Sequence, residues 1–178
     1  MVDFPDPLCP IIPSHVVFIM TFYIIVATLV TMRILGIDPG IAIVGFGVIE
    51  IIKKKIMVVG YGAITTSTDQ SFAQCLLTIQ SNMQSLIETY NPTTCGMEEL
   101  YFSKNVKTAM AVSHARGVIL CAVEGQGIPV SSYSPTTVKQ VLTGYGAAEK
   151  KQMQYMVKET LHLKKIPKPD DVADALAV

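Results

Sequence analysis

Residues 34–50, ILGIDPGIAIVGFGVIE, contain the pattern that decides the fold of this chain. Residues 34–37 form a continuous apolar run that predicts a buried strand, and residues 43–49 predict a second strand after a tight connection. Asp38-Pro39-Gly40 turns the chain sharply between them, so we expect a hairpin. The turn places the Asp38 carboxylate at the end of the first strand, where it can project from the edge of the sheet.

Strand and helix signals alternate after this hairpin. Asn91-Pro92 ends a helix whose apolar residues recur every three or four positions and which Thr68-Asp69 can cap. The expected elements are strands at 56–64, 94–97 and 128–133, and helices at 71–90, 105–123, 134–142, 149–163 and from 169 onward. Three antiparallel strands followed by alternating helices and strands predict an α/β domain with a five-stranded mixed sheet covered by helices on both faces.

Composition divides the chain at about Met32. Of its 178 residues 50% are apolar and only 16% charged, which excludes a disordered protein. All 14 Lys and Arg residues lie at Arg33 or later, and residues 1–32 carry only Asp3 and Asp6. We therefore expect an apolar extension at 1–31 and a globular domain at 33–178.

The apolar extension has three possible interpretations. Residues 16–32 approach the length of a membrane-spanning helix, and the segment could also be an added core element or lie outside the working domain, with Met32 as the natural start. No linker separates the apolar run from the first strand, so a bilayer would collide with the domain. We therefore expect a cytoplasmic protein with no membrane partner.

Four carboxylates are candidate ligands for divalent metal ions. Asp38 and Glu98 end the first and fourth strands, which can be neighbours in a mixed sheet. Asp171 and Asp174 are three residues apart and share one helix face. Carboxylates brought together repel unless cations compensate, and two divalent ions held this way can promote phosphodiester hydrolysis. The alternative is three unrelated features: a turn cap, a solvated strand end and acidic residues at a helix start.

Five segments, in order and spacing, closely resemble the RuvC family of crossover junction endodeoxyribonucleases. They are residues 34–50, GMEELYFSKN (96–105), HARGVILCAVE (114–124), TTVKQVLTGYGAAEKKQMQYMV (136–157) and DDVADALAV (170–178). The resemblance covers residues 33–178. It implies a ribonuclease H-like fold, a homodimer, and Mg2+-dependent paired nicking of Holliday junctions in homologous recombination and DNA repair. Two Mg2+ ions, with Mn2+ as a substitute, and a branch-migration helicase complex as partner are also implied.

The resemblance also assigns roles to residues. The family's catalytic, metal-binding carboxylates match Asp38, Glu98, Asp171 and Asp174, with Asp170 as the register alternative to Asp171. Basic residues of the family's DNA-binding face match Lys139 and Lys150. Tyr101 or Phe102 falls where the family places an aromatic near the junction centre, suited to stacking on an unpaired base. Family members begin at about Met32 and continue beyond DALAV, so we expect this chain to be cut at Val178.

Three other functions share part of these signals. An ATP-binding protein of the actin and sugar-kinase type opens with a similar strand, Asp and Gly, but needs a second domain that this length does not supply. A related small nuclease that trims ribosomal RNA precursors shares the first Asp-x-Gly. A junction-binding protein that has lost cleavage is disfavoured because all four carboxylates are present.

Overall fold

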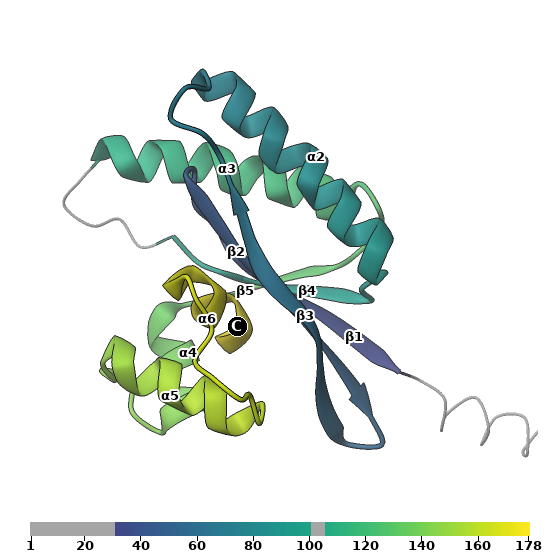
Figure 1. The fold of residues 1–178 in the computed structure, drawn as a ribbon, viewed down its shortest axis with the longest axis vertical. Helices are drawn as coiled ribbons and strands as arrows, with labels where there is room; N and C mark the ends of the chain where they lie inside the picture. The colour runs from purple at the N-terminus through teal and green to yellow at the C-terminus, as the bar shows by residue number, and fades with distance from the viewer. Residues whose placement is uncertain (1–30, 101–105) are drawn as a thin grey trace, which may run out of the picture. The chain divides into compact units, whose positions relative to one another are not determined.

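The central sheet has five strands in the order β3-β2-β1-β4-β5 (Figure 1). The computed structural model describes residues 31–100 and 106–178. β2 is antiparallel to both β1 and β3, whereas β4 is parallel to both β1 and β5. The strand bounds are β1 Met32–Asp38, β2 Ile43–Ile52, β3 Lys55–Thr65, β4 Thr94–Glu98 and β5 Val130–Tyr133. The predicted five-stranded mixed sheet is confirmed.

Helices cover both faces of the sheet, as predicted (Figure 1). α2 and α3 pack together on one face, while α6 lies on the other face with α4 and α5 beside it. The helix bounds are α2 Phe72–Tyr90, α3 Val106–Glu124, α4 Pro135–Thr143, α5 Lys150–Thr160 and α6 Asp170–Ala177. Each expected helix is present. α5 ends before the predicted residue 163, because His162 adopts a left-handed backbone conformation that a helix cannot continue.

The main core lies between the sheet and the α2–α3 face. Leu35 and Ile37 alternate with Gly36 along β1, so their side chains point to this face, where they pack with Ile79 and Met83 of α2. Ser71 caps α2 by accepting a hydrogen bond from the Gln74 backbone N–H, so the expected cap at Thr68-Asp69 is wrong. The hydroxyl directly before the first helical turn reaches this N–H, and residues farther upstream lie in a separate turn.

Two glycines let α6 lie directly on the other face of the sheet. A Cβ atom on Gly36 would lie 2.1 Å from the backbone oxygen of Ala175, and one on Gly45 would lie 2.0 Å from that of Asp171. Only a residue without a side chain allows backbone to approach this closely. β1 and β2 therefore set the position of α6, including its first turn.

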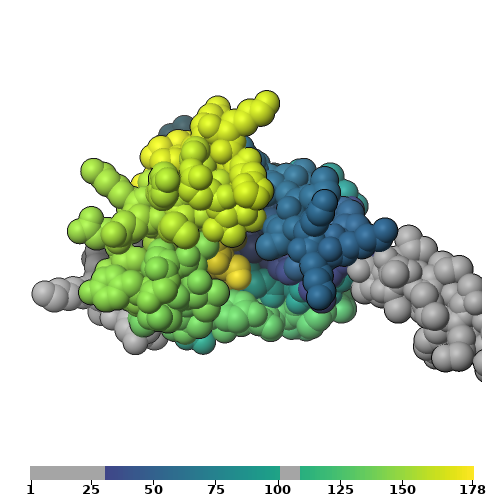
Figure 2. Space-filling view, turned by 90° about the horizontal axis from the view of Figure 1, so that it is seen from below, coloured from purple at the N-terminus to yellow at the C-terminus, as the bar shows by residue number. Residues whose placement is uncertain are grey.

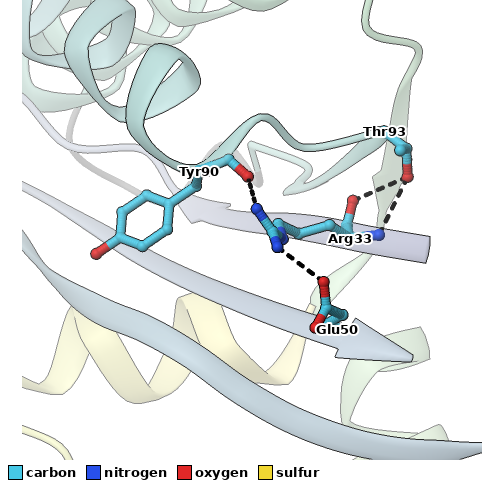
Figure 3. A network of polar contacts seen from close by, with 4 residues as sticks. All are labelled: Arg33, Glu50, Tyr90 and Thr93. Atoms are coloured by element: carbon cyan, nitrogen blue, oxygen red, sulfur yellow. Dashed lines mark hydrogen bonds and ion pairs between the residues drawn. The ribbon is translucent and has the colours of Figure 1, made fainter. Parts of the chain in front are cut away.

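Arg33 ties β1 to β2 and to the end of α2 (Figure 3). Its guanidinium donates to the Glu50 carboxylate at 2.8 Å and to the backbone oxygen of Tyr90. Its backbone N–H and C=O both bond the Thr93 hydroxyl, at 3.2 and 3.0 Å. The side chains of Arg33 and Glu50 are only 30% and 17% exposed, so this pair is better shielded from water than an ordinary surface ion pair.

Arg33→Met is expected to lower the free energy of unfolding by about 2 kcal/mol, because the Glu50 carboxylate and the Tyr90 carbonyl lose their donor while half-buried. Urea denaturation measures the change. Lys158→Met is the matched control, since Lys158 pairs with Glu159 on the surface and should change nothing measurable. Equal effects of the two substitutions would contradict a structural role for Arg33.

The predictions for residues 1–31 fall, except for Thr31, outside the described residues and stay predictions. Met32–Val178 forms one compact unit. In the part of the chain that the structure describes, no helix is both long enough and apolar enough to cross a membrane.

Candidate active site

Asp38 and Glu98 lie side by side at the carboxyl ends of two parallel strands. The register of β1 and β4 pairs Ile37 with Met97, so the next residue of each strand is a carboxylate. Parallel neighbours end at the same edge of a sheet, which brings these two side chains to one place. The expectation that the first and fourth strands are neighbours is confirmed.

α6 brings two further carboxylates to this edge. Gly45 pairs with Asp38 across β1 and β2, and the backbone of Asp171 rests directly on Gly45. Asp174 follows after nearly one turn, on the same side of the helix as Asp171. Three elements distant in sequence, β1, β4 and α6, therefore converge on one site.

The Asp170 carboxylate forms a hydrogen bond with Lys168. The carboxylate accepts this hydrogen bond at 2.9 Å, which lowers the pKa of Asp170. Asp171, in contrast, is among the carboxylates that raise the pKa of Asp38. Of the two register alternatives, Asp171 is the one whose charge acts on Asp38, whereas the charge of Asp170 acts on Asp174 and Lys150.

Burial and mutual repulsion dominate the electrostatics of the site. Burial, followed by the charges of Glu98, Asp174 and Asp171, raises the pKa of Asp38 from 3.8 to about 8. Burial raises the pKa of Glu98 and of Asp174 as well. Lys150 opposes the shift at all three carboxylates. The site holds more negative charge than its own cations balance.

A pocket of about 210 Å³ opens at these carboxylates. Its polar lining is Glu98, Asp174, Lys139 and Lys150, and its apolar lining is Pro135, Val138, Met153 and Ala177. Both lysines that sequence reasoning assigned to DNA therefore share a pocket with two of the predicted catalytic carboxylates. Tyr101 and Phe102, the aromatic candidates, lie outside the described residues.

Lys150 has a contact that sequence reasoning missed. Its ammonium group lies 3.2 Å from the Asp174 carboxylate and 3.6 Å from that of Asp170. No spacing rule in the sequence signals this contact, because α5 and α6 meet only in the tertiary structure.

Within residues 31–100 and 106–178, no group of three or more His, Cys, Asp and Glu side chains is gathered closely enough to hold a metal ion.

The raised pKa of Asp38 predicts that the metal-free protein loses stability as the pH rises. Between about pH 4 and pH 8 the unfolded chain has released the Asp38 proton while the folded chain still binds it. Raising the pH in this range therefore favours unfolding. Asp38→Asn should therefore gain stability over the parent as the pH rises, by at most about 1.4 kcal/mol per pH unit. Urea denaturation in EDTA at about pH 5 and about pH 8 measures it. Parallel pH profiles would contradict the raised pKa.

Comparisons with known proteins agree with this geometry. The family model of crossover junction endodeoxyribonuclease RuvC matches residues 34–178. The chain is 55% identical to the crossover junction endodeoxyribonuclease RuvC of Brevibacillus brevis, over 83% of this chain and 89% of that protein. It is 52% identical to that of Clostridioides difficile, over 83% and 87%.

Two solved structures are also similar to this chain. The structure of Thermus thermophilus RuvC in complex with Holliday junction substrate superposes with a TM-score of 0.77 at 33% identity, covering 82% of this chain and 89% of that one. The structure of yeast mitochondrial Holliday junction resolvase Ydc2 is 17% identical with a TM-score of 0.59, covers 82% of this chain and 75% of that one, and shows the shared fold alone. Three findings agree: the order of the strands in the sheet, the convergence of β1, β4 and α6, and a family match over residues 34–178. This chain therefore belongs to the RuvC family of crossover junction endodeoxyribonucleases.

Proposed function

We propose that this chain resolves Holliday junctions by paired, symmetric nicks that depend on Mg2+, in homologous recombination and DNA repair. The observation that carries the proposal is that Glu98 and Asp174 line one pocket with Lys139 and Lys150, while the charges of Glu98, Asp174 and Asp171 act on the neighbouring Asp38. Carboxylates serve phosphodiester hydrolysis and lysines bind phosphates, so the pocket combines both requirements of a nuclease.

The donor set fits hard divalent cations. Carboxylate oxygens are the ligands that Mg2+ takes. Burial, and after it the charges of Glu98, Asp174 and Asp171, raises the pKa of Asp38, and a bound cation would oppose both effects. We assign Asp38, Glu98, Asp171 and Asp174 to two Mg2+ ions, with Mn2+ as a substitute. Bound divalent ions supply Lewis-acid stabilisation of the charge that develops on phosphate oxygens. Asp174 would join this set by turning its carboxylate away from Lys150, a rotation that the half-buried side chain permits.

The two lysines would hold the DNA backbone at the pocket. Lys139 and Lys150 come from different helices and line the same wall, so one phosphate can approach both. Lys150 has a second role in the free protein, where it balances Asp174. We further assign Tyr101 or Phe102 to stacking near the junction centre.

Lys139→Ala is expected to flatten the salt dependence of junction binding by about one counterion, because one phosphate contact is lost. Lys139 is the better probe of the two, since Lys150 also contacts Asp174. Fluorescence anisotropy with a labelled junction in EDTA at several salt concentrations gives the slope. Lys54→Ala, in the exposed turn between β2 and β3, is the control and should keep the parent slope. If Lys139→Ala also keeps it, Lys139 does not contact phosphate.

Paired nicks require two sites related by symmetry, so the proposal includes a homodimer. It also includes association with a branch-migration helicase complex and a cytoplasmic location, where such DNA intermediates occur in a bacterium. Residues 1–31 are proposed to be dispensable for nicking. Each of these points rests on membership of the family.

The deciding experiment is nicking of a synthetic four-way junction. With Mg2+ the protein should cut two opposed strands at symmetric positions, and with EDTA it should cut none. A linear duplex with the same sequence is the control and should stay intact. Equal cutting of junction and duplex would contradict the proposed resolvase and indicate a nuclease without junction specificity. If neither DNA is cut, the protein binds junctions without cleaving them.

A further inference from the structure

A second pocket lies on the outer side of α5. It has a volume of about 420 Å³ and is lined by Thr143, Tyr145, Lys151, Gln152, Tyr155 and Met156. Thr143 ends α4, Tyr145 lies in the connection, and the other four residues belong to α5. We call this the tyrosine pocket.

α5 separates the tyrosine pocket from the pocket of about 210 Å³ at Glu98 and Asp174, which we call the catalytic pocket. Lys150 and Met153 line the catalytic pocket, whereas the neighbouring Lys151 and Gln152 line the tyrosine pocket. Figure 2 shows the lobe built by α4 to α6, in green to yellow, beside the hairpin of β2 and β3, in blue. The green part of the lobe, which contains α4 and the start of α5, lies on the side away from that hairpin. The two pockets therefore lie on neighbouring faces of one helix, α5.

Core packing does not account for the two tyrosines. Tyr145 is 63% exposed and Tyr155 is 54% exposed, while the buried side of α5 consists of Met153, Gln154 and Val157. Two exposed aromatic rings on one pocket offer flat apolar faces that water solvates poorly. Such rings are the usual platform for a nucleic-acid base, because every base has a π-face that can stack.

The charge of the tyrosine pocket also suits a nucleic acid. Among the described residues, Lys151 is the only charged residue that lines the pocket, and no carboxylate lines it. The Lys158 ammonium lies 5.9 Å from the centroid of the Tyr155 ring, but it is paired with Glu159, so Lys151 carries the free positive charge. A phosphate can approach Lys151 while the attached base reaches the rings. The Gln152 amide nitrogen can donate to the base edge, since the amide oxygen accepts from the Glu149 backbone N–H at 3.0 Å.

We propose that the tyrosine pocket binds an unpaired nucleobase of the junction strand whose phosphate lies in the catalytic pocket. Lys150 and Tyr155 are five residues apart on α5, so one helix carries a residue of each pocket. The subsite would hold the strand a fixed distance from the nick. This inference rests on the proposed function and adds a substrate contact to it.

The test uses the full chain and a four-way junction that carries 2-aminopurine at single positions within a few nucleotides of the crossover. In EDTA, stacking on tyrosine should quench the fluorescence of one or two of these positions beyond the quenching in free DNA. Tyr145→Leu with Tyr155→Leu should abolish this quenching and weaken junction binding roughly tenfold. The double Tyr→Phe variant keeps both rings and should behave like the parent.

Two controls separate the subsite from a general effect. Tyr61→Leu removes another exposed tyrosine, on β3, and should leave quenching and affinity unchanged. Lys151→Ala, which removes no ring, should weaken binding and keep the quenching. If the Leu double variant fails to fold, the single variants Tyr145→Leu and Tyr155→Leu replace it, and each should lose part of the quenching. Unchanged quenching in the folded Leu double variant would overturn the proposal. The tyrosine pocket would then be a candidate site for a protein partner instead of a nucleobase.

Failure of the subsite and failure of the proposed function give different results. If the parent nicks the junction but no 2-aminopurine position responds, the nucleobase subsite is wrong and the resolvase stands. If the parent does not nick, the same titration with a single-stranded 2-aminopurine oligonucleotide decides the subsite by itself. Quenching that the Leu variants lose then supports it, and no quenching refutes it.

Discussion

Asp38→Asn is expected to nick a four-way junction more slowly than the parent by roughly three orders of magnitude or more. Asp38 lies between Glu98 on the adjacent strand and the carboxylates of α6, so it is central to the proposed cation site. An amide keeps the shape of the side chain but removes the negative charge that a divalent ion requires. Nicking in Mg2+ under single-turnover conditions measures the loss.

Junction binding by Asp38→Asn should survive in EDTA and can become tighter, because one negative charge facing the phosphates is gone. Asp170→Asn is the matched control, since its carboxylate is engaged by Lys168 and Lys150 and should be dispensable for nicking. Asp171→Asn should resemble Asp38→Asn. If Asp38→Asn nicks at the parent rate, the proposed cation site is wrong; if Asp170→Asn loses activity and Asp171→Asn keeps it, the two aspartates exchange roles.

Gly45→Ala is expected to lower the free energy of unfolding by about 3 kcal/mol. The added Cβ would lie 2.0 Å from the backbone oxygen of Asp171, 2.4 Å from its carbonyl carbon and 3.0 Å from the nitrogen of Val172. These are backbone atoms, so no side-chain rotation relieves the clash, and the first turn of α6 must move away from β2. Because that turn carries Asp171, nicking should also fall in the protein that stays folded.

Gly117→Ala is the control for this substitution. Gly117 lies inside α3, and a Cβ there would meet no heavy atom within 4 Å. Alanine in a helix is favoured over glycine by about 0.5–1 kcal/mol, so this variant should be slightly more stable than the parent and equally active. Urea denaturation and junction nicking of both variants make the comparison. A Gly45→Ala protein with parent stability and activity would show that α6 does not rest on β2 as described.

Much of the fold was predictable because its signals are local. The apolar runs on either side of Asp38-Pro39-Gly40 predicted the hairpin of β1 and β2, and Asn91-Pro92 marked the end of α2. The position of Glu98 at the end of β4 followed from the same kind of pattern. Helix ends were less predictable: the cap of α2 is Ser71, and α5 stops at Thr160, because both depend on the backbone conformation of one or two residues.

The four carboxylates of the proposed site were predictable as individual residues, and their arrangement was not. The sequence by itself determined that Asp38 and Glu98 end strands and that Asp171 and Asp174 share a helix face, since strand ends and helix periodicity are properties of short segments. The tertiary structure alone decided that α6 packs across β1 and β2 at Gly36 and Gly45. It also decided that the charge of Asp171 acts on Asp38, that Asp170 accepts a hydrogen bond from Lys168, and that Lys150 pairs with Asp174. The physical reason is that these contacts join segments more than 20 residues apart or depend on the rotation of one helix about its axis, and packing against the sheet sets both.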